Sequence, residues 1–162
     1  MVSSDDFRHA MAKFATGVTV ITTLDPSGNP HAMTANAFTS VCLDPPTLLV
    51  CVAHNTITYG YVEEQKRIGV NVLREEQEEL GMYFARRPEQ RVGNPEYSYT
   101  MGEHDVPELD GSMVFFNCDI VGSHVYGDHT IYVGEVKQMK QSGDDANPLM
   151  FYDSHWYHPA HE

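Results

Sequence analysis

The chain has 162 residues, of which 41% are hydrophobic, and a formal net charge of −13 at pH 7. This length suits one compact domain over 1–162 with a substantial core, and the charge makes nucleic acid and anionic membrane surfaces poor partners. The N-terminus carries acids where a signal peptide carries bases, and no apolar run approaches a membrane span. The odd set of three cysteines, Cys42, Cys51 and Cys118, has no metal-ligand spacing. We therefore expect a cytoplasmic protein with reduced thiols and no metal, membrane or nucleic-acid partner.

The first third of the chain predicts one helix followed by strands. Apolar residues fall at helical spacing over 7–14, after a Ser4 cap. A β-branched strand over 18–24 and turn residues over 25–29 lead into segment 31–46, which is rich in small and hydroxyl side chains. This pair predicts a hairpin. Segment 31–46 is expected to be one strand that the double proline ends, because proline lacks an N–H.

The remainder adds two helices and several more strands. Strands are predicted over 47–53, 67–73, 113–121, 129–138 and 149–152, helices over 56–66 and 75–87, a surface excursion over 88–112, and loops over 122–128 and 141–147. Strands outnumber helices and many are joined by short turns, which favours a mainly β fold, an antiparallel barrel with flanking helices. The sequence holds no G-x-G-x-x-G motif after a strand and no Walker loop, so a nucleotide would have to be held in another way.

Segment 31–46 is the most informative part of the chain. Its small side chains leave the backbone N–H and C=O groups uncovered enough to contact a flat polar ligand, such as the edge of a flavin ring. The alternative is an ordinary barrel strand with small residues. In order along the chain, the motifs are Thr16–Thr23, Met33–Pro46, Gly69–Leu73, Gly127–Val136 and Pro148–Tyr152.

These five motifs, in this order and spacing, resemble the short-chain flavin reductase family, the reductase components of two-component flavin monooxygenases. The resemblance covers residues 6–157. It implies an FMN-binding split β-barrel that forms a homodimer, binds FMN or FAD non-covalently and reduces it with NADH or NADPH. It also implies a separate oxygenase component as partner, which receives the reduced flavin.

The resemblance assigns the flavin ring to one stretch, through its backbone: Thr34, Asn36, Ala37, Phe38, Thr39, Ser40 and Cys42. Fixed N–H dipoles there would stabilise the negative charge that hydride addition builds. It assigns the phosphate to His54, Thr56, Thr58 and Tyr59 at a helix N-terminus. The alternative for the two threonines is an N-cap pair with no ligand.

The phosphate-binding turn departs from the family pattern. His54 stands where the family has Lys or Arg, and histidine is neutral for much of the time near pH 7. Arg86, after Phe84 and Ala85, matches a family position at the flavin and would supply the missing charge. The alternative for Arg86 is a solvated arginine at a helix end.

The resemblance places His129, which follows Gly127 and Asp128, near the nicotinamide side of the flavin. Hydride transfer needs alignment rather than a base, so His129 is assigned a positioning role among the catalytic residues. A structural histidine that caps the turn is the alternative. Tyr152 and Trp156 would stack on the pyridine nucleotide. Asp153 and Ser154 stand where the family has Arg-Gly, which removes a cation for the pyrophosphate.

Three functions follow from these residues. The favoured one is an NAD(P)H:flavin oxidoreductase. The alternative is a flavin-binding electron-transfer or carrier protein with little NAD(P)H turnover, which the replacements at His54 and Asp153 suggest. A third possibility, a metal-responsive binding protein, is supported by composition alone, because His155, His158 and His161 are better explained as a solvated tail. The implied homodimer would bury an aromatic surface over 94–116: Tyr97, Tyr99, Phe115 and Phe116.

Overall fold

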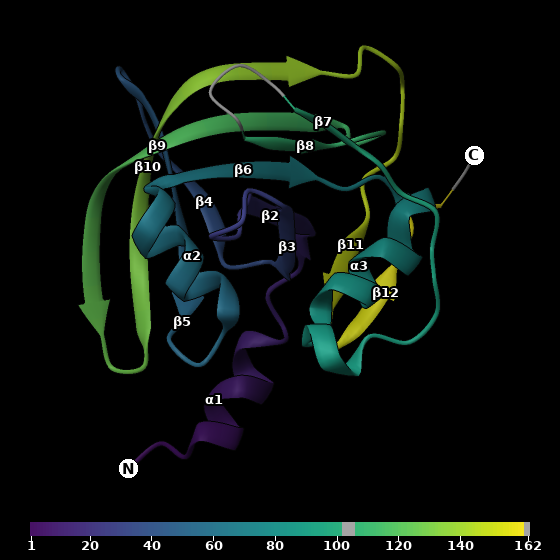
Figure 1. The fold of residues 1–162 in the computed structure, drawn as a ribbon. Coiled ribbons are helices and arrows are strands. Elements are labelled where there is room, and N and C mark those ends of the chain that lie inside the picture. The colour runs from purple at the N-terminus through teal and green to yellow at the C-terminus, as the bar shows by residue number, and fades with distance from the viewer. Residues whose placement is uncertain (102–105, 161–162) are drawn as a thin grey trace.

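A seven-stranded antiparallel sheet forms the centre of the molecule (Figure 1). The computed structural model describes residues 1–101 and 106–160. The strand order is β3-β2-β6-β9-β10-β5-β4. The strands are β2 (Thr19–Leu24), β3 (Pro30–Ala35), β4 (Phe38–Leu43), β5 (Pro46–Ala53), β6 (Arg67–Val72), β9 (Val114–Tyr126) and β10 (His129–Gln141). The predicted mainly β class is confirmed. β3 and β4, which follow each other in the chain, are the two edges of this sheet.

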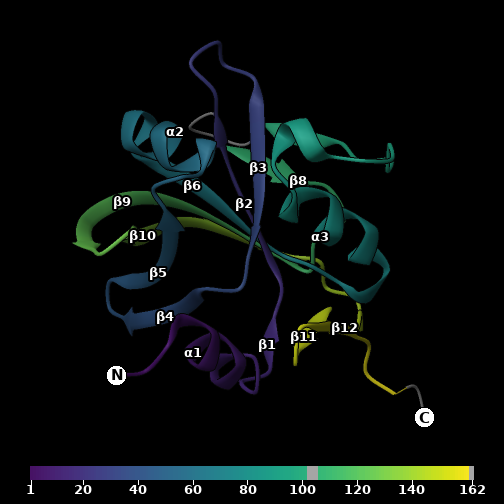
Figure 2. The ribbon, with the colours of Figure 1, turned by 90° about the horizontal axis from the view of Figure 1, so that it is seen from below.

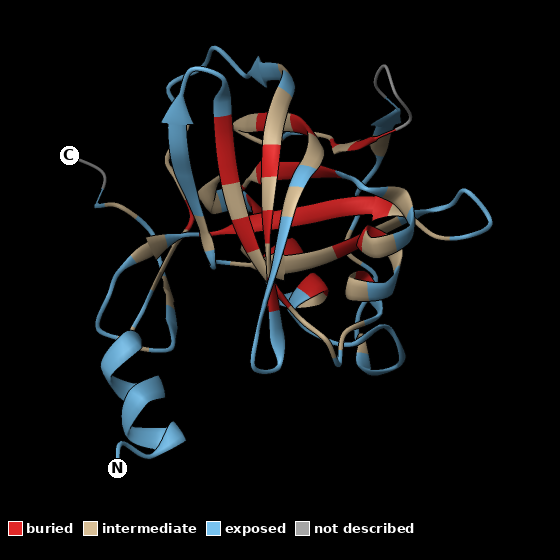
Figure 3. Ribbon diagram, turned by 90° about the vertical axis from the view of Figure 1, so that its left-hand side faces the viewer, coloured by how far each residue is buried: buried red, intermediate tan, exposed pale blue. Residues whose placement is uncertain are grey.

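The core lies on the inner side of the central strands, which are buried along much of their length (Figure 3). Ile21 of β2, Val50 of β5, Ile68 of β6 and Tyr132 of β10 belong to one fully buried cluster. β-branched and aromatic side chains fit such a pleated surface. Apolar burial of this kind contributes about 25 cal/mol per Å² and positions the strand ends that form the site.

Helices and two small sheets surround the central sheet. The helices are α1 (Ser4–Met11), α2 (Ile57–Gln65) and α3 (Glu78–Ala85), with short 3-10 turns η1 (Glu75–Gln77) and η2 (Pro88–Gln90). One small sheet contains β1 (Thr16–Gly17), β11 (Met150–Tyr152) and β12 (His155–Tyr157), and the other β7 (Tyr99–Met101) and β8 (Pro107–Leu109). β3 passes between α2 and α3 and contacts both (Figure 2). In the described ranges, no helix is long and apolar enough to cross a membrane.

Segment 31–46 differs from its prediction because it contains two strands. The Phe38 N–H donates to the Asn36 carbonyl over 2.9 Å, which closes a three-residue turn. This turn carries the chain from one edge of the sheet to the other. At the far end, Pro46 does not end the ladder but begins β5, where it pairs with Leu43.

Two other boundaries also differ. The cap of α1 is Ser3, whose hydroxyl accepts the Asp6 N–H over 3.1 Å, rather than Ser4. The predicted loop over 122–128 is mostly strand, because β9 continues to Tyr126 and only Gly127 and Asp128 turn the chain. Gly127 has a φ of 57°, a conformation that glycine adopts without strain. The predicted hairpin between strand 18–24 and the start of segment 31–46 is confirmed by the pairing of β2 with β3.

The expected aromatic surface over 94–116 is wrong for most of its rings. Phe115 is only 5% exposed, Phe116 packs on the main core, and Tyr99 packs on a second core cluster beside Phe84. Tyr97 alone stays open, at 40% exposure. Phe115 and Phe116 are covered because they lie in β9, a central strand of the sheet, and Tyr99 is covered because hydrogen bonds dock β7 and β8 onto that sheet.

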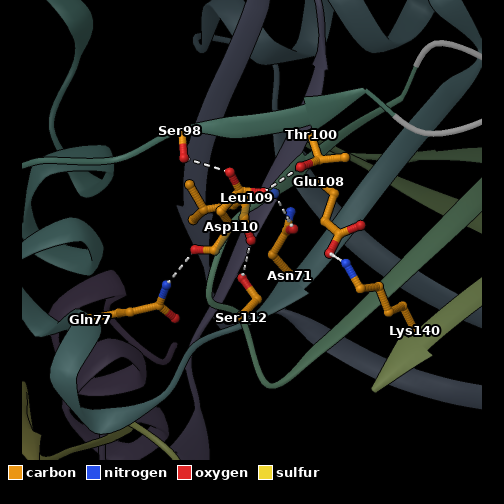
Figure 4. Close-up of polar contacts among 9 residues, drawn as sticks. All are labelled: Asn71, Gln77, Ser98, Thr100, Glu108, Leu109, Asp110, Ser112 and Lys140. Atoms are coloured by element: carbon orange, nitrogen blue, oxygen red, sulfur yellow. Dashed lines mark hydrogen bonds and ion pairs between the residues drawn. The ribbon is translucent and has the colours of Figure 1, made fainter. Parts of the chain in front are cut away.

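Those hydrogen bonds converge on two residues (Figure 4). The fully buried Asn71 side chain accepts the Leu109 N–H over 2.8 Å and donates to the Val20 carbonyl over 3.0 Å. The Asp110 carboxylate accepts the hydroxyls of Ser98, at 2.5 Å, and Thr100, at 2.7 Å. These hydroxyls lower the pKa of Asp110. Because buried polar groups need partners, these bonds hold residues 98–101 and 107–112 against the central sheet.

Candidate functional site

Two cavities lie along β3 and share one residue, Ala85 at the end of α3. The first has a volume of about 130 Å³ and is lined by His31 to Met33, Asn55 to Thr58, and Phe84 to Glu89 with Arg91. The second has a volume of about 180 Å³ and is lined by Val18, Thr34 to Asn36, Ala85, Phe151 and Trp156. The two cavities, which follow one another along β3, are together called here the β3 groove. A larger hollow of about 750 Å³ beside η1 is lined by Glu76, Glu79, Glu96 and Asp110, which would repel an anionic ligand.

β3 is suited to contact a ligand because it is an edge strand. One row of its N–H and C=O groups faces away from β2 and has no strand partner. Thr34 fixes the strand to α3, since its hydroxyl donates to the Gly81 carbonyl over 2.7 Å. Asn36 lies exposed at the end of the groove, where its amide donates to the Thr16 hydroxyl over 3.3 Å.

The other end of the groove meets the N-terminus of α2. Thr56 is the N-cap: its hydroxyl accepts the Tyr59 N–H over 3.3 Å and donates to the Ala53 carbonyl over 2.7 Å. The first turn of α2 holds no acidic residue, so the positive end of the helix dipole is not neutralised there. Such a helix end attracts anions.

Two residues of this end were not assigned from the sequence. Arg91 donates from Nη2 to the Ala32 carbonyl over 2.7 Å and lies over the rings of Tyr83 and Phe84. His31 lies with its Nε2 2.8 Å from the Thr58 hydroxyl. His31 belongs to segment 31–46, so the sequence could have assigned it to the site. Arg91 lies in a stretch without periodicity, and no sequence pattern pointed to it.

Burial and, to a lesser extent, the nearby Arg91 guanidinium lower the pKa of His31 to about 4. His31 is therefore neutral near pH 7, and the first cavity keeps its positive charge on arginine side chains alone. Arg86, Arg87 and Arg91 supply this charge, opposed by Glu89.

The His31 pKa predicts a pH-dependent stability. An unfolded histidine titrates near pH 6.5, so between pH 6.5 and 4 the unfolded chain binds the extra proton, and the unfolding free energy falls as the pH falls. The full linkage value is roughly 3 kcal/mol, which solvent screening of the partly exposed ring reduces to about 2 kcal/mol. Urea denaturation at pH 7 and pH 4.5 measures this loss. We expect His31→Gln to lose less stability over this range, and an equal loss in both proteins would contradict the prediction.

The structure brings about half of the assigned residues into the β3 groove. Those present are Thr34, Asn36, Thr56, Thr58, Phe84, Ala85, Arg86 and Trp156. The other residues assigned to the flavin ring lie outside both cavities: Ala37 lies in the turn, and Phe38, Thr39, Ser40 and Cys42 lie in β4. Thr39 and Ser40 are exposed there, Phe38 packs on Phe116, and Cys42 Sγ lies 3.0 Å from the Pro45 carbonyl.

Four further assigned residues, His54, Tyr59, His129 and Tyr152, also lie outside both cavities of the groove. The His54 ring has its Nε2 2.9 Å from the Thr130 hydroxyl and packs against Tyr59 with ring centroids 4.6 Å apart. His129 lies at the tip of the β9–β10 hairpin, with Nδ1 2.7 Å from the Asp128 carboxylate. Tyr152 packs on Tyr157. The interaction with His129 lowers the pKa of Asp128.

Asp153 and His158, which were also considered from the sequence, each have a partner. Asp153 accepts a hydrogen bond from Lys13 over 2.6 Å, which lowers the pKa of its carboxyl. His158 lies with Nε2 2.6 Å from Glu78, and His161 lies outside the described residues. No group of three His, Cys, Asp or Glu side chains in 1–101 and 106–160 is arranged to hold a metal ion.

Comparisons with known proteins agree on one family. The family model described as "Flavin reductase like domain" matches residues 11–160. An NADH-dependent flavin reductase from Rhodococcus sp is 38% identical over 147 residues, which cover 90% of this chain and 80% of that protein. The stachydrine N-demethylase reductase subunit Stc3 from Rhizobium meliloti is 38% identical over 136 residues, which cover 84% of this chain but only 58% of that longer protein.

The fold agrees with the sequence. The styrene monooxygenase flavin reductase from Pseudomonas putida S12 superposes with a TM-score of 0.86 and 30% identity, and the match covers 97% of this chain and 99% of that one. The family match spans nearly all of both described ranges, including β3 and both of its cavities. The chain therefore belongs to the flavin reductase like family.

Proposed function

We propose that this protein is an NAD(P)H:flavin oxidoreductase that transfers a hydride from NADH or NADPH to FMN or FAD. The observation that carries the proposal is the β3 groove, in which an uncovered strand edge at Thr34 to Asn36 leads to an arginine-lined helix N-terminus at Thr56. A flavin has the same polarity along its length, with a flat polar ring at one end and phosphate at the other. The family membership and the named activity of the Rhodococcus relative support the assignment.

The residues of the groove fit a flavin in three ways. The exposed backbone around Asn36 offers fixed dipoles to the ring edge, where they need no reorganisation as charge develops. Trp156 and Phe151, whose ring centroids lie 5.2 Å apart, close the second cavity with an apolar wall and limit access of water. Thr56 and the N-terminus of α2 would hold the phosphate. When bound, the flavin supplies the ring that accepts the hydride.

The nicotinamide must lie over that ring, because hydride transfer needs reacting atoms roughly 3 to 3.5 Å apart. Trp156 is the assigned residue of the nucleotide side that already lies in the groove. We assign His129 to hold the nicotinamide carboxamide, with Asp128 fixing its ring orientation through the 2.7 Å contact. His129 lies on a hairpin outside the β3 groove, so in this proposal it acts across the dimer, on the nucleotide bound by the second copy.

The proposed homodimer uses apolar surface that the single chain leaves open. α1 buries none of its residues; Phe7 within it is 61% exposed, and Phe14, which follows it, is 69% exposed. The outer half of the β9–β10 hairpin exposes Val125 at 66% and Tyr126 at 71%. Exposed apolar surface of this kind marks association sites. The seven-stranded sheet, coiled with its edges β3 and β4 joined by one turn, is the proposed split barrel.

The reduced flavin is proposed to pass to a separate oxygenase component. The styrene monooxygenase flavin reductase and the Stc3 reductase subunit are named as parts of such systems, and this supports the same role here. The three free cysteines support the cytoplasm as the location.

The test is a steady-state assay of the purified protein. NADH and NADPH are each mixed with FMN and FAD, and loss of absorbance at about 340 nm, where the reduced nicotinamide absorbs, is followed. We expect turnover with at least one pair. Stoichiometric yellow flavin with negligible turnover would instead identify the carrier protein. The pairing of Asp153 with Lys13 makes the carrier less favoured, because the carboxylate is already neutralised.

A further inference from the structure

Basic side chains are unevenly paired in this acidic protein. The chain has ten lysines and arginines and a net charge of −13. Seven of the ten form an ion pair with a carboxylate. The three for which the described parts of the chain offer no such pair are Arg86, Arg87 and Arg91, and all three line the first cavity of the β3 groove. Cations held without carboxylate partners at one cavity indicate a site for an anion.

Arg91 differs from the other two because it is held in place. Its Nη2 donates to the Ala32 carbonyl over 2.7 Å, and its Nε donates to the Arg86 carbonyl over 3.4 Å. The guanidinium carbon lies 5.2 Å from the ring centroid of Tyr83 and 5.1 Å from that of Phe84. Arg86 and Arg87 are exposed, whereas Arg91 is half-buried. A fixed guanidinium loses little conformational entropy when it binds an oxyanion.

We infer that Arg91 selects phosphorylated flavins by binding the flavin phosphate against the N-terminus of α2. The inference rests on the proposed function and adds the residue that determines specificity within it. The sequence places the expected cation at His54, but that ring contacts Thr130 and lies outside the cavity. Arg91, which lies more than thirty positions further along the chain than His54, supplies the cation instead. Riboflavin has no phosphate, so its binding affinity is not increased by an ionic contact with Arg91.

The experiment compares FMN with riboflavin as ligands of the intact protein. Binding is followed by quenching of flavin fluorescence, and turnover with NADH or NADPH is measured for both. We expect the wild-type protein to bind FMN at least about tenfold more tightly than riboflavin. Arg91→Gln should reduce this ratio by about tenfold or more, because the affinity for FMN falls further than the affinity for riboflavin. Arg67→Gln is the matched control, because it removes the same charge at a residue that pairs with Asp119 and does not line the cavity.

Two further variants guard against a folding defect in Arg91→Gln. Arg91→Lys keeps the charge but loses the planar fork, so we expect a ratio between those of the wild type and Arg91→Gln. Glu89→Gln removes the one carboxylate that lines the cavity and should raise the ratio by about threefold.

The outcomes separate the two proposals. An FMN-to-riboflavin ratio that is unchanged in both Arg91 variants, with turnover intact, would overturn the role of Arg91 and leave the reductase standing. A wild-type protein that turns over no flavin would overturn the reductase and this inference with it. Inorganic phosphate should compete with FMN in the wild-type protein and not in Arg91→Gln.

Discussion

Ala85→Trp is expected to abolish flavin binding while the protein stays folded. Ala85 ends α3, is exposed, and is the residue shared by the two cavities of the β3 groove. An indole at this point would fill the passage between the ring end and the phosphate end. We expect the dissociation constant for FMN or FAD to rise at least about 30-fold, which corresponds to about 2 kcal/mol. Flavin fluorescence titration measures the loss, and the melting temperature reports the fold.

Met82→Trp provides the control for this experiment. Met82 lies on the same helix, is 37% exposed and lines neither cavity. The added indole should therefore leave flavin affinity within about twofold of the wild type. If Ala85→Trp bound flavin as tightly as Met82→Trp, the flavin would have to lie elsewhere on the protein.

Gly69→Ala is expected to cause the largest loss of stability. A Cβ at this position of β6 would lie 2.2 Å from Thr22 Oγ1, 2.8 Å from Phe115 Cε2 and 2.9 Å from the Pro107 carbonyl oxygen. Two of these contacts are with the central sheet and one with the docked strand β8, so none can yield easily. Overpacking of this severity costs about 3 kcal/mol. For a chain of this size, that lowers the melting temperature by roughly 6–12 °C.

Gly60→Ala tests whether this loss comes from packing rather than from adding a methyl group to any glycine. A Cβ at Gly60, in the exposed part of α2, meets no atom within 4 Å. Alanine in a helix is favoured over glycine by about 0.5–1 kcal/mol, so this variant should be slightly stabilised. A loss of stability at Gly60 equal to that at Gly69 would refute the packing explanation. Thermal unfolding of both variants makes the comparison.

The sequence predicted strands and helices well where one residue pattern decides the structure. The β-branched run that forms β2 and the turn before β3 are local signals. The sequence could not predict that Asn36 and Ala37 turn the chain between two sheet edges, because that turn depends on which strands pair. It also misjudged Tyr99, since the buried hydrogen bond between Asn71 and Leu109 that docks β8, the partner strand of Tyr99, joins residues far apart in sequence.

The same limit applies to the candidate site. Thr56 is recognisable because an N-cap hydroxyl before a helix is a local motif, and Thr58 follows it in the first turn of α2. Arg91 is not recognisable in this way, because its role depends on the carbonyl of Ala32, 59 positions away. His54 shows the converse: a matching position in a motif does not fix where a side chain points when another partner, Thr130, is within reach.

The turn at Asn36 and Ala37 has one more consequence. It is the covalent link between β3 and β4, which form the two open edges of the central sheet. A ligand that contacts the backbone on both sides of this turn would connect the two edge strands. Its binding would raise the free energy of local unfolding of both strands together. Amide hydrogen exchange should then slow together in β3 and β4, although these strands lie at opposite ends of the sheet order.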